Sequence, residues 1–349
     1  MRFFALFGLL ATVLTAFATE IAPKVVVVTM FEPGKDTGDT PGEFQFWVER
    51  LKLDKVYPLP LAYHDVRANA DGSVIAIVTG VGNTRAAATI MALGSDPRFD
   101  LTHSYWLVAG IAGIDPAKAS LGSAAWAEWI VNGDLGHEID PREVPADWPT
   151  GYVPLRRTRP YELPQDPDDS SQVFHLNHAL TTWAFQLTKD IKLADTEAMK
   201  QRRAAFTGYP NAQRPPFVLL GDTLSSETFW HGKLMNRWAN DWVKYHTGGK
   251  ASYTTTAMED IGTLQSLTWL ARAGRVDLRR VMVLRTASNF DMQPPGMTAV
   301  ESMFGEKFTH YSAYIPSLEA AFQVGNTVVQ ALLADWEKFK MEPPVAKQP

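Results

Sequence analysis

The residues best suited to chemistry follow an apolar run, in the stretch VLRTASNFDMQPPG at positions 283–296. The run opens like a buried strand, and five hydrogen-bonding residues then fall within seven positions: Arg285, Thr286, Ser288, Asn289 and Asp291. An amide such as Asn289 donates and accepts hydrogen bonds, whereas a carboxyl group such as Asp291 can also transfer a proton. Arginine and threonine are also ordinary strand-end residues. Asn289 is therefore the first candidate in this stretch for contact with a ligand.

A second polar group, Met258-Glu259-Asp260, stands between the strand-like residues 253–257 and an amphipathic stretch. Glu259 has two interpretations. A carboxylate that accepts hydrogen bonds from a ligand contributes about 1.5–3 kcal/mol per charge-assisted bond. A carboxylate at the start of a helix instead complements the helix dipole, which is worth about 0.3–1 kcal/mol. The residues by themselves leave both interpretations open.

Two glycine-containing turns follow other apolar runs. Gly80-Val81-Gly82 precedes a helical segment, and the backbone N–H groups of such a turn favour an anion, although a plain tight turn is the simpler interpretation. Arg85 occupies the third place of the dinucleotide-binding glycine pattern, so dinucleotide binding is disfavoured. In the second turn, Gly110 and Gly113 would let the backbone approach a ligand or a neighbouring element closely.

The elements that must position these groups alternate along the chain. Segments with strand character occupy residues 23–31, 73–80, 104–110, 122–134, 214–222 and 280–288. Helical segments occupy residues 83–93, 261–274 and 317–339. This alternation predicts an α/β fold with a central sheet. The prolines of segment 140–170 predict a long loop or a cover over a site, without regular elements.

Composition narrows the class of protein further. The 349 residues are 46% hydrophobic and carry a net charge of −5 without a long basic run, so we expect no nucleic-acid partner. The chain has no cysteine, and its eight histidines show no metal-binding spacing, so we expect neither a metal nor another cofactor.

The N-terminus has the features of a signal peptide. Arg2 precedes an apolar run that ends in Ala16-Phe17-Ala18, which predicts cleavage near Ala18. We therefore expect a periplasmic or secreted protein without a membrane span in its mature chain. The expected organisation is a signal peptide at 1–18, one domain at 19–340 and a tail at 341–349.

In chain order, five stretches resemble motifs of the purine nucleoside phosphorylase and methylthioadenosine nucleosidase superfamily. They are Thr79-Gly80-Val81-Gly82, Gly110-Ile111-Ala112-Gly113, Gly221-Asp222, Ala257-Met258-Glu259-Asp260 and Arg285-Thr286-Ala287-Ser288-Asn289. TMFEPGKDTGDTPGEFQFW (29–47), GDTLSSETFWHG (221–232) and RTASNFDMQPP (285–295) are more closely similar to the purine nucleoside permeases. The resemblance implies a nucleoside phosphorylase-like, three-layer α/β/α fold with a central mixed sheet, and a purine nucleoside as ligand. A solute-conducting role would need membrane-spanning segments, and the sequence shows none after residue 18.

The resemblance also implies roles for single residues. Glu259 matches the glutamate that binds the ribose hydroxyls, and Met258 matches the methionine that lies against the sugar. Asn289 stands where the nucleosidases carry an aspartate that protonates or hydrogen-bonds purine N7. An amide can donate to N7 or O6 but is no general acid near pH 7. The trimeric purine phosphorylases use an asparagine for base recognition and prefer 6-oxopurines, so the resemblance implies a hypoxanthine- or guanine-type base. Asp291, two residues further on, is the alternative acid.

The remaining implied roles concern the reaction class. Glu43 is our first choice for the base that activates water, with Glu32 as the alternative. The phosphate ligands of the hexameric phosphorylases correspond here to Val108 and Ile111, so hydrolysis is favoured over phosphorolysis. Arg85 keeps phosphorolysis open, with phosphate as the second substrate.

Substrate contacts are expected from backbone and aromatic groups. Gly80 and Gly110 would approach the substrate through their backbone, while Phe229 and Trp230, with His231, would stack on the base or pack in the core.

Two further alternatives stay open. The missing acid and phosphate ligands also fit a protein that binds purine nucleosides without cleaving them. Since the related proteins form dimers, trimers and hexamers, a homo-oligomer of unspecified size is expected.

Overall fold

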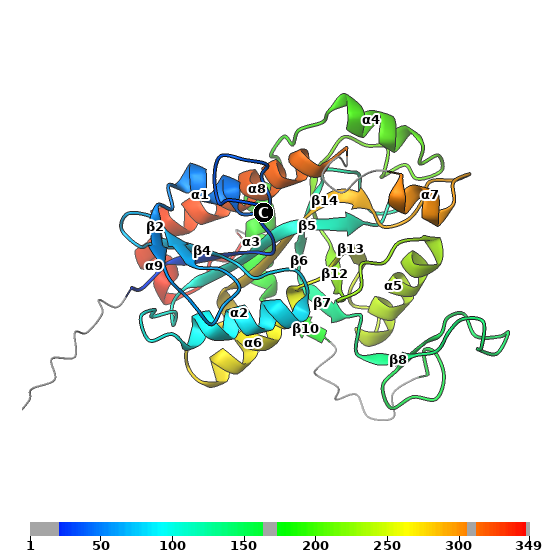
Figure 1. Cartoon of the computed structure of the whole chain (residues 1–349), viewed down its shortest axis with the longest axis horizontal. Coiled ribbons are helices and arrows are strands. Elements are labelled where there is room, and N and C mark those ends of the chain that lie inside the picture. Colours follow the sequence, from blue (N-terminus) through cyan, green and yellow to red (C-terminus); the bar gives the residue numbers. More distant parts are fainter. Residues whose placement is uncertain (1–20, 163–172, 306–311, 347–349) are drawn as a thin grey trace, which may run out of the picture.

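The computed structural model describes residues 21–162, 173–305 and 312–346, and a large mixed sheet forms its centre (Figure 1). The longest strands, β5 (Tyr105–Ile114) and β14 (Val281–Phe290), pair in parallel. Hydrogen-bonded neighbours in the sheet follow the order β10-β7-β12-β13-β5-β1-β4-β3-β2. The strands β6, β11 and β14 belong to the same sheet but lie outside this order. Parallel and antiparallel pairs both occur, because β5 pairs in parallel with β1 and antiparallel with β13. The expected central mixed sheet is therefore confirmed.

The other ten strands of this sheet are short. They are β1 (Val25–Thr29), β2 (Lys55–Tyr57), β3 (Val66–Ala68), β4 (Val74–Val78), β6 (Ala124–Ala127), β7 (Trp129–Asn132), β10 (Val173–His175), β11 (Val218–Leu220), β12 (Asp222–Ser225) and β13 (Tyr253–Ala257). The single strand expected at 122–134 is interrupted at Glu128, which separates β6 from β7.

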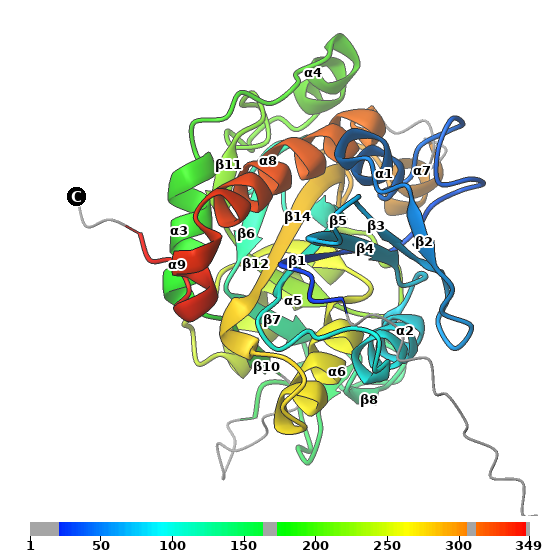
Figure 2. The same ribbon diagram turned by 90° about the vertical axis from the view of Figure 1, so that its left-hand side faces the viewer.

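Helices cover both faces of the sheet (Figure 2). In β1, Val25 and Val27 pack into a core with α1 (Gln45–Leu51), α3 (His178–Thr188) and α8 (Tyr314–Ala334). The alternate residues Val26 and Val28 pack into a second core with α2 (Asn83–Ser95) and α6 (Asp260–Arg272). Because successive side chains of a strand point to opposite faces, this alternation produces the three layers.

The helices α2 and α6 touch through their backbones. A side-chain carbon at Gly262 would lie 2.0 Å from the carbonyl oxygen of Asn83, so only glycine permits this approach. The Asn83 side chain also accepts a hydrogen bond of 3.0 Å from the Gly262 N–H. The first turns of the two helices therefore meet at one end of the sheet.

The remaining elements lie around this framework: α4 (Glu197–Ala204), α5 (Lys233–His246), the 3₁₀ turn η1 (Leu278–Arg280), α7 (Ala299–Phe304) and α9 (Trp336–Met341). A small antiparallel pair joins β8 (Gly136–Glu138) to β9 (Tyr152–Pro154). The proline-rich segment thus contains a short strand where the sequence predicts none. The proposed signal peptide lies outside the described residues, as does part of the proline-rich segment, 163–170. Across the described chain, no helix has both the length and the apolar character needed to cross a bilayer.

Candidate functional site

A cavity of about 280 Å³ lies where β1, β13 and β14 end, beside the second half of β5. This volume is close to the lower end of ordinary ligand pockets, about 300–1,000 Å³. The lining combines apolar groups with a few polar ones: Met30, Phe31, Glu43, Val81, Ile111, Ala112, Gly113, Phe229, Thr256, Ala257, Met258, Glu259, Ser288 and Asn289. Residues far apart in the sequence therefore meet in one small site.

Glu43 precedes α1 and projects its buried carboxyl group into this cavity. One oxygen accepts a hydrogen bond of 2.7 Å from the Met30 N–H and the other accepts one of 2.7 Å from the Ile111 N–H. Burial raises the pKa of Glu43 to about 8, although the nearby Arg285 guanidinium opposes that rise. Gly110 leaves room for the carboxyl group, because a side-chain carbon there would lie 2.6 Å from Glu43 Oε1.

Glu32, the alternative base, has a different task. Its carboxylate accepts hydrogen bonds from the backbone N–H groups of Gly42, Phe44 and Gln45, at the start of α1. Glu32 is not among the residues that line the cavity. Its contacts hold the segment that carries Glu43, so the geometry favours Glu43 over Glu32 as the group that meets a ligand.

Glu259 immediately precedes α6 but makes no side-chain capping bond to that helix. Its carboxylate accepts hydrogen bonds from the N–H groups of Gly82 (3.3 Å) and Met258 (3.2 Å). Glu259 is buried and lines the cavity, and burial raises its pKa while Arg285 opposes the rise. Of the two interpretations of this glutamate, the geometry favours ligand contact over capping.

Arg285 lies behind the two glutamates and balances part of their charge. It is buried, forms an ion pair with Asp260, and its Nη2 lies 3.4 Å from Glu259 Oε2. Its Nη1 donates to the carbonyl oxygen of Ile111. The sequence indicated a structural role for Arg285 but did not indicate its pairing with Asp260, which lies 25 positions away.

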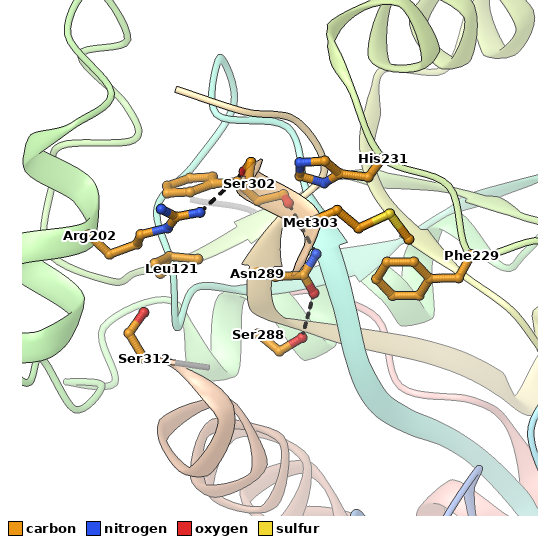
Figure 3. A pocket seen from close by; sticks show the side chains of 10 residues that line it. Leu121, Arg202, Phe229, His231, Ser288, Asn289, Ser302, Met303 and Ser312 are labelled. Atoms are coloured by element: carbon orange, nitrogen blue, oxygen red, sulfur yellow. Dashed lines mark hydrogen bonds between the residues drawn. The ribbon is translucent and has the colours of Figure 1, made fainter. Parts of the chain in front are cut away.

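Asn289 also lines the cavity, and its amide is held in one orientation, as Figure 3 shows in a close view of the neighbouring pocket that Asn289 lines as well. Its Nδ2 donates a bond of 3.1 Å to the carbonyl oxygen of Phe290, which can only accept. The amide oxygen therefore faces Ser288, whose hydroxyl donates to it at 2.9 Å. One N–H of Asn289 remains for a ligand, and Ser288 positions it.

Asp291 and Trp230 do not line this cavity. The Asp291 carboxyl group is buried and accepts hydrogen bonds from Asn236 and Tyr253, and burial raises its pKa well above the usual range. Trp230 packs in a cluster with Trp238 and Tyr253. Both residues therefore support the wall of the site, whereas Phe229 and Met258 reach the cavity itself.

The turn at Gly80 lies close to the cavity, but Gly80 itself is not one of the residues that line it. At the start of α2, the Glu227 carboxylate accepts hydrogen bonds of 2.7 Å from both the N–H and the hydroxyl of Thr84. Arg85 is exposed and stacks over Tyr63, 5.9 Å from its ring centre. A carboxylate of the chain itself thus occupies the position where an external anion was considered.

Several lining residues were not singled out as site residues from the sequence, namely Met30, Phe31, Val81 and Thr256. The first three lie within stretches that carry the family resemblance, and Thr256 lies in the strand-like segment just before Met258 and Glu259, so these neighbourhoods were the available signal. Within the described part of the chain, no group of three or more His, Asp or Glu side chains is arranged to hold a metal ion.

Comparison with known proteins gives consistent results. The model of a family described as "Purine nucleoside permease (NUP)" matches residues 22–344. A purine nucleoside permease of Candida albicans is 31% identical over 321 residues, which cover 91% of this chain and 76% of that protein. A probable purine nucleoside permease of Schizosaccharomyces pombe is 29% identical over 331 residues, which cover 90% of each chain.

Solved structures share the fold at low sequence identity. Futalosine hydrolase of Helicobacter pylori has a TM-score of 0.51 at 14% identity, covering 90% of this chain and 99% of its own. A 5′-methylthioadenosine/S-adenosylhomocysteine nucleosidase of Neisseria meningitidis, solved with methylthio-immucillin-A, has a TM-score of 0.51 at 13% identity, covering 88% and 99%. The expected nucleoside phosphorylase-like fold is confirmed.

Proposed function

This chain belongs to the purine nucleoside permease family, and on that premise we propose that it binds purine nucleosides and hydrolyses their N-glycosidic bond. The observation that carries the proposal is the placement of two buried carboxyl groups, Glu43 and Glu259, in one cavity with the oriented amide of Asn289. Carboxylates suit sugar hydroxyls, and an amide beside an aromatic ring suits a base.

The proposed orientation follows from the polarity of the cavity. Glu259 accepts hydrogen bonds from the ribose hydroxyls, and Met258 lies against the sugar. The base extends toward Asn289 and Phe229, which offer one N–H and an apolar face. This orientation brings the anomeric carbon toward Glu43.

Hydrolysis needs a base and an attacking water. The ionised Glu43 removes a proton from water, the water oxygen bonds to the anomeric carbon, and the carbon–nitrogen bond breaks with its electron pair passing to the base. The Asn289 N–H stabilises the charge that develops on the purine, and the departing base takes its proton from solvent. Because the pKa of Glu43 lies near 8, the rate should rise with pH through this region.

Water is favoured over phosphate as the nucleophile. None of the described residues that line the cavity is lysine or arginine, so no cationic side chain of this lining would neutralise a phosphate. Ile111, which corresponds to a phosphate ligand of the hexameric phosphorylases, has no hydroxyl group that could bind phosphate. The Glu227 carboxylate already accepts the hydrogen bond of the Thr84 N–H at the start of α2. Phosphorolysis is therefore the weaker candidate.

Binding without cleavage is the second candidate, and one observation favours it. The residue nearest the proposed base position is an amide, which cannot protonate a leaving purine near pH 7. The apolar segment 3–18 is the basis for proposing export to the periplasm or the exterior, where a binding protein would capture nucleosides.

One experiment separates these functions. The protein is incubated with inosine, guanosine and adenosine, with and without phosphate, while chromatography follows the free base and calorimetry follows binding. Base released without phosphate supports hydrolysis, and base released only with phosphate contradicts it. Binding without release supports the second candidate. Glu43→Gln should abolish release, whereas Glu337→Gln, a change at an exposed residue of α9, should not.

A further inference from the structure

A second cavity, of about 240 Å³, lies between β8 and α5 (Figure 1). It is lined by the β8–β9 pair with the residues just before it, by the segment between β12 and α5, and by α5 itself. The lining residues are Gly133, Asp134, Gly136, His137, Glu138, Tyr152, Ser226, Thr228, Trp230, Met235, Trp238 and Trp242. None of these lines the cavity that we assign to nucleosides, although Thr228 and Trp230 flank Phe229, which does. The volume lies slightly below that of ordinary ligand pockets, so the second cavity has room for a small organic molecule.

Aromatic rings form much of its lining. The ring of Trp230 stands nearly perpendicular to that of Trp238, at 85° with 5.9 Å between the ring centres. The ring of Tyr152 lies 4.6 Å from that of Trp238 and is tilted by 33°. Trp242 packs on the other side chains of this cluster from the next turn of α5. Tryptophan is the aromatic residue whose ring face attracts cations most strongly.

Carboxylates form the polar part of the lining. Asp134 Oδ2 accepts hydrogen bonds from the Asn83 amide (3.1 Å) and the Glu227 N–H (2.8 Å). Glu138 Oε1 accepts one of 3.3 Å from the hydroxyl of Tyr152. Burial raises the pKa of Tyr152 to about 12, and the negative charges of Glu138 and Asp134 act in the same direction. Both carboxylates therefore lie near the Tyr152 hydroxyl, at one end of the aromatic cluster.

The negative charge of this cavity is not balanced by the residues around it. No lysine or arginine belongs to the lining. Among the described residues, none forms an ion pair with Asp134 or Glu138. Two carboxylates beside several aromatic rings attract a positive charge and disfavour an anion.

We propose that this second cavity binds a small alkylammonium cation, which lies against the tryptophan rings while Asp134 and Glu138 balance its charge. Alkyl groups on the nitrogen suit the apolar rings, and a positive charge without N–H groups needs no hydrogen-bond acceptor at every side. The two cavities share no lining residue, so this inference is independent of the proposed function.

The test compares two probes of the same shape. Choline carries a trimethylammonium group, and 3,3-dimethylbutan-1-ol has a carbon atom in place of the charged nitrogen. Calorimetric titrations at one pH and one ionic strength give the dissociation constant of each probe. We expect choline to bind about 10-fold more tightly than the neutral alcohol, because only choline gains from the rings and the carboxylates.

Two variants locate the binding. Glu138→Gln keeps the shape of the side chain and removes its charge, so it should weaken choline about 3- to 10-fold and leave the neutral alcohol within about twofold. Trp238→Leu removes a ring and should weaken choline about 10-fold and the alcohol less. Glu143→Gln, at an exposed residue of the loop between β8 and β9, is the matched control and should leave both constants unchanged. Urea denaturation shows whether each variant is folded, and if Trp238→Leu does not fold, Glu138→Gln decides alone.

Three results would overturn the inference: no binding of choline, equal affinity for choline and the neutral alcohol, or undiminished choline binding by Glu138→Gln. Because none of these measurements uses a nucleoside, failure of the proposed function leaves this test unaffected, and failure here leaves the proposed function unaffected.

Discussion

Replacing Glu43 with glutamine should change how the stability of the protein depends on pH. The folded protein holds a carboxyl group whose pKa is about 8, whereas the same group titrates near 4.5 when it is exposed. Between these values the folded protein keeps a proton that the unfolded chain has released. Stability from this group is therefore complete below about pH 4.5 and is lost as pH rises through about 8.

The size of the effect follows from the two pKa values. The interval from 4.5 to about 8 corresponds to about 5 kcal/mol of unfolding free energy, or about 1.4 kcal/mol for each pH unit. Replacing Glu43 with glutamine removes this pH dependence, but the substitution itself lowers the stability of the folded protein. Its NH₂ group must face the N–H of either Met30 or Ile111, and losing that hydrogen bond costs about 1–3 kcal/mol at every pH.

The two effects predict a change of sign. The parent protein should be more stable than Glu43→Gln near pH 5, and the variant should be the more stable near pH 8.5, where the buried carboxylate is ionised. Urea denaturation at several pH values and one ionic strength measures both proteins. Glu337→Gln, at an exposed site, should differ from the parent by a constant amount. A constant difference for Glu43→Gln as well would refute the reasoning.

Three further substitutions test the other contacts. Glu259→Gln should weaken the binding of ribonucleosides about 10- to 100-fold, and of 2′-deoxynucleosides less, in calorimetric titrations, because a charge-assisted bond to a hydroxyl is lost. In Asn289→Asp, the carbonyl oxygen of Phe290, which can only accept, favours the protonated carboxyl group. Transfer of that proton from its bond with Phe290 to the departing base should supply the missing acid and speed base release. Slower release at every pH would contradict this. Glu227→Ala should lower the free energy of unfolding by about 0.5–2 kcal/mol in urea, as the loss of a helix-capping group does. An unchanged value would mean that its bonds to Thr84 contribute nothing.

The sequence predicted the framework of the site well. Apolar runs indicated the buried strands, and the polar residues after them indicated Glu259 and Asn289, since both signals are local. The side of the sheet that each residue faces was harder to foresee. β14 ends at Phe290 and the chain then bends, so Asp291 does not continue the alternation that would have placed it beside Asn289.

Contacts between distant segments could not be predicted from the sequence. Glu32 and Glu43 stand eleven positions apart in the same loop, and both precede the same helix. Only the fold shows that the backbone N–H of Ile111, 68 positions from Glu43, donates a hydrogen bond to the carboxyl group of Glu43 and not to that of Glu32. The pairing of Arg285 with Asp260 depends in the same way on two elements that meet only in three dimensions.

The backbone contact between Gly262 and Asn83 also limits how a ligand can enter. Because α2 and α6 touch without intervening side chains, they cannot slide past one another without a clash, and they should move as one rigid unit. Passage into the cavity therefore depends on its other walls. Phe229 lines the cavity with its side chain 40% exposed, whereas the next residue, Trp230, is packed in the aromatic cluster. Exchange of ligand should accordingly depend on rotation of the Phe229 side chain, while the first turns of α2 and α6 stay in place.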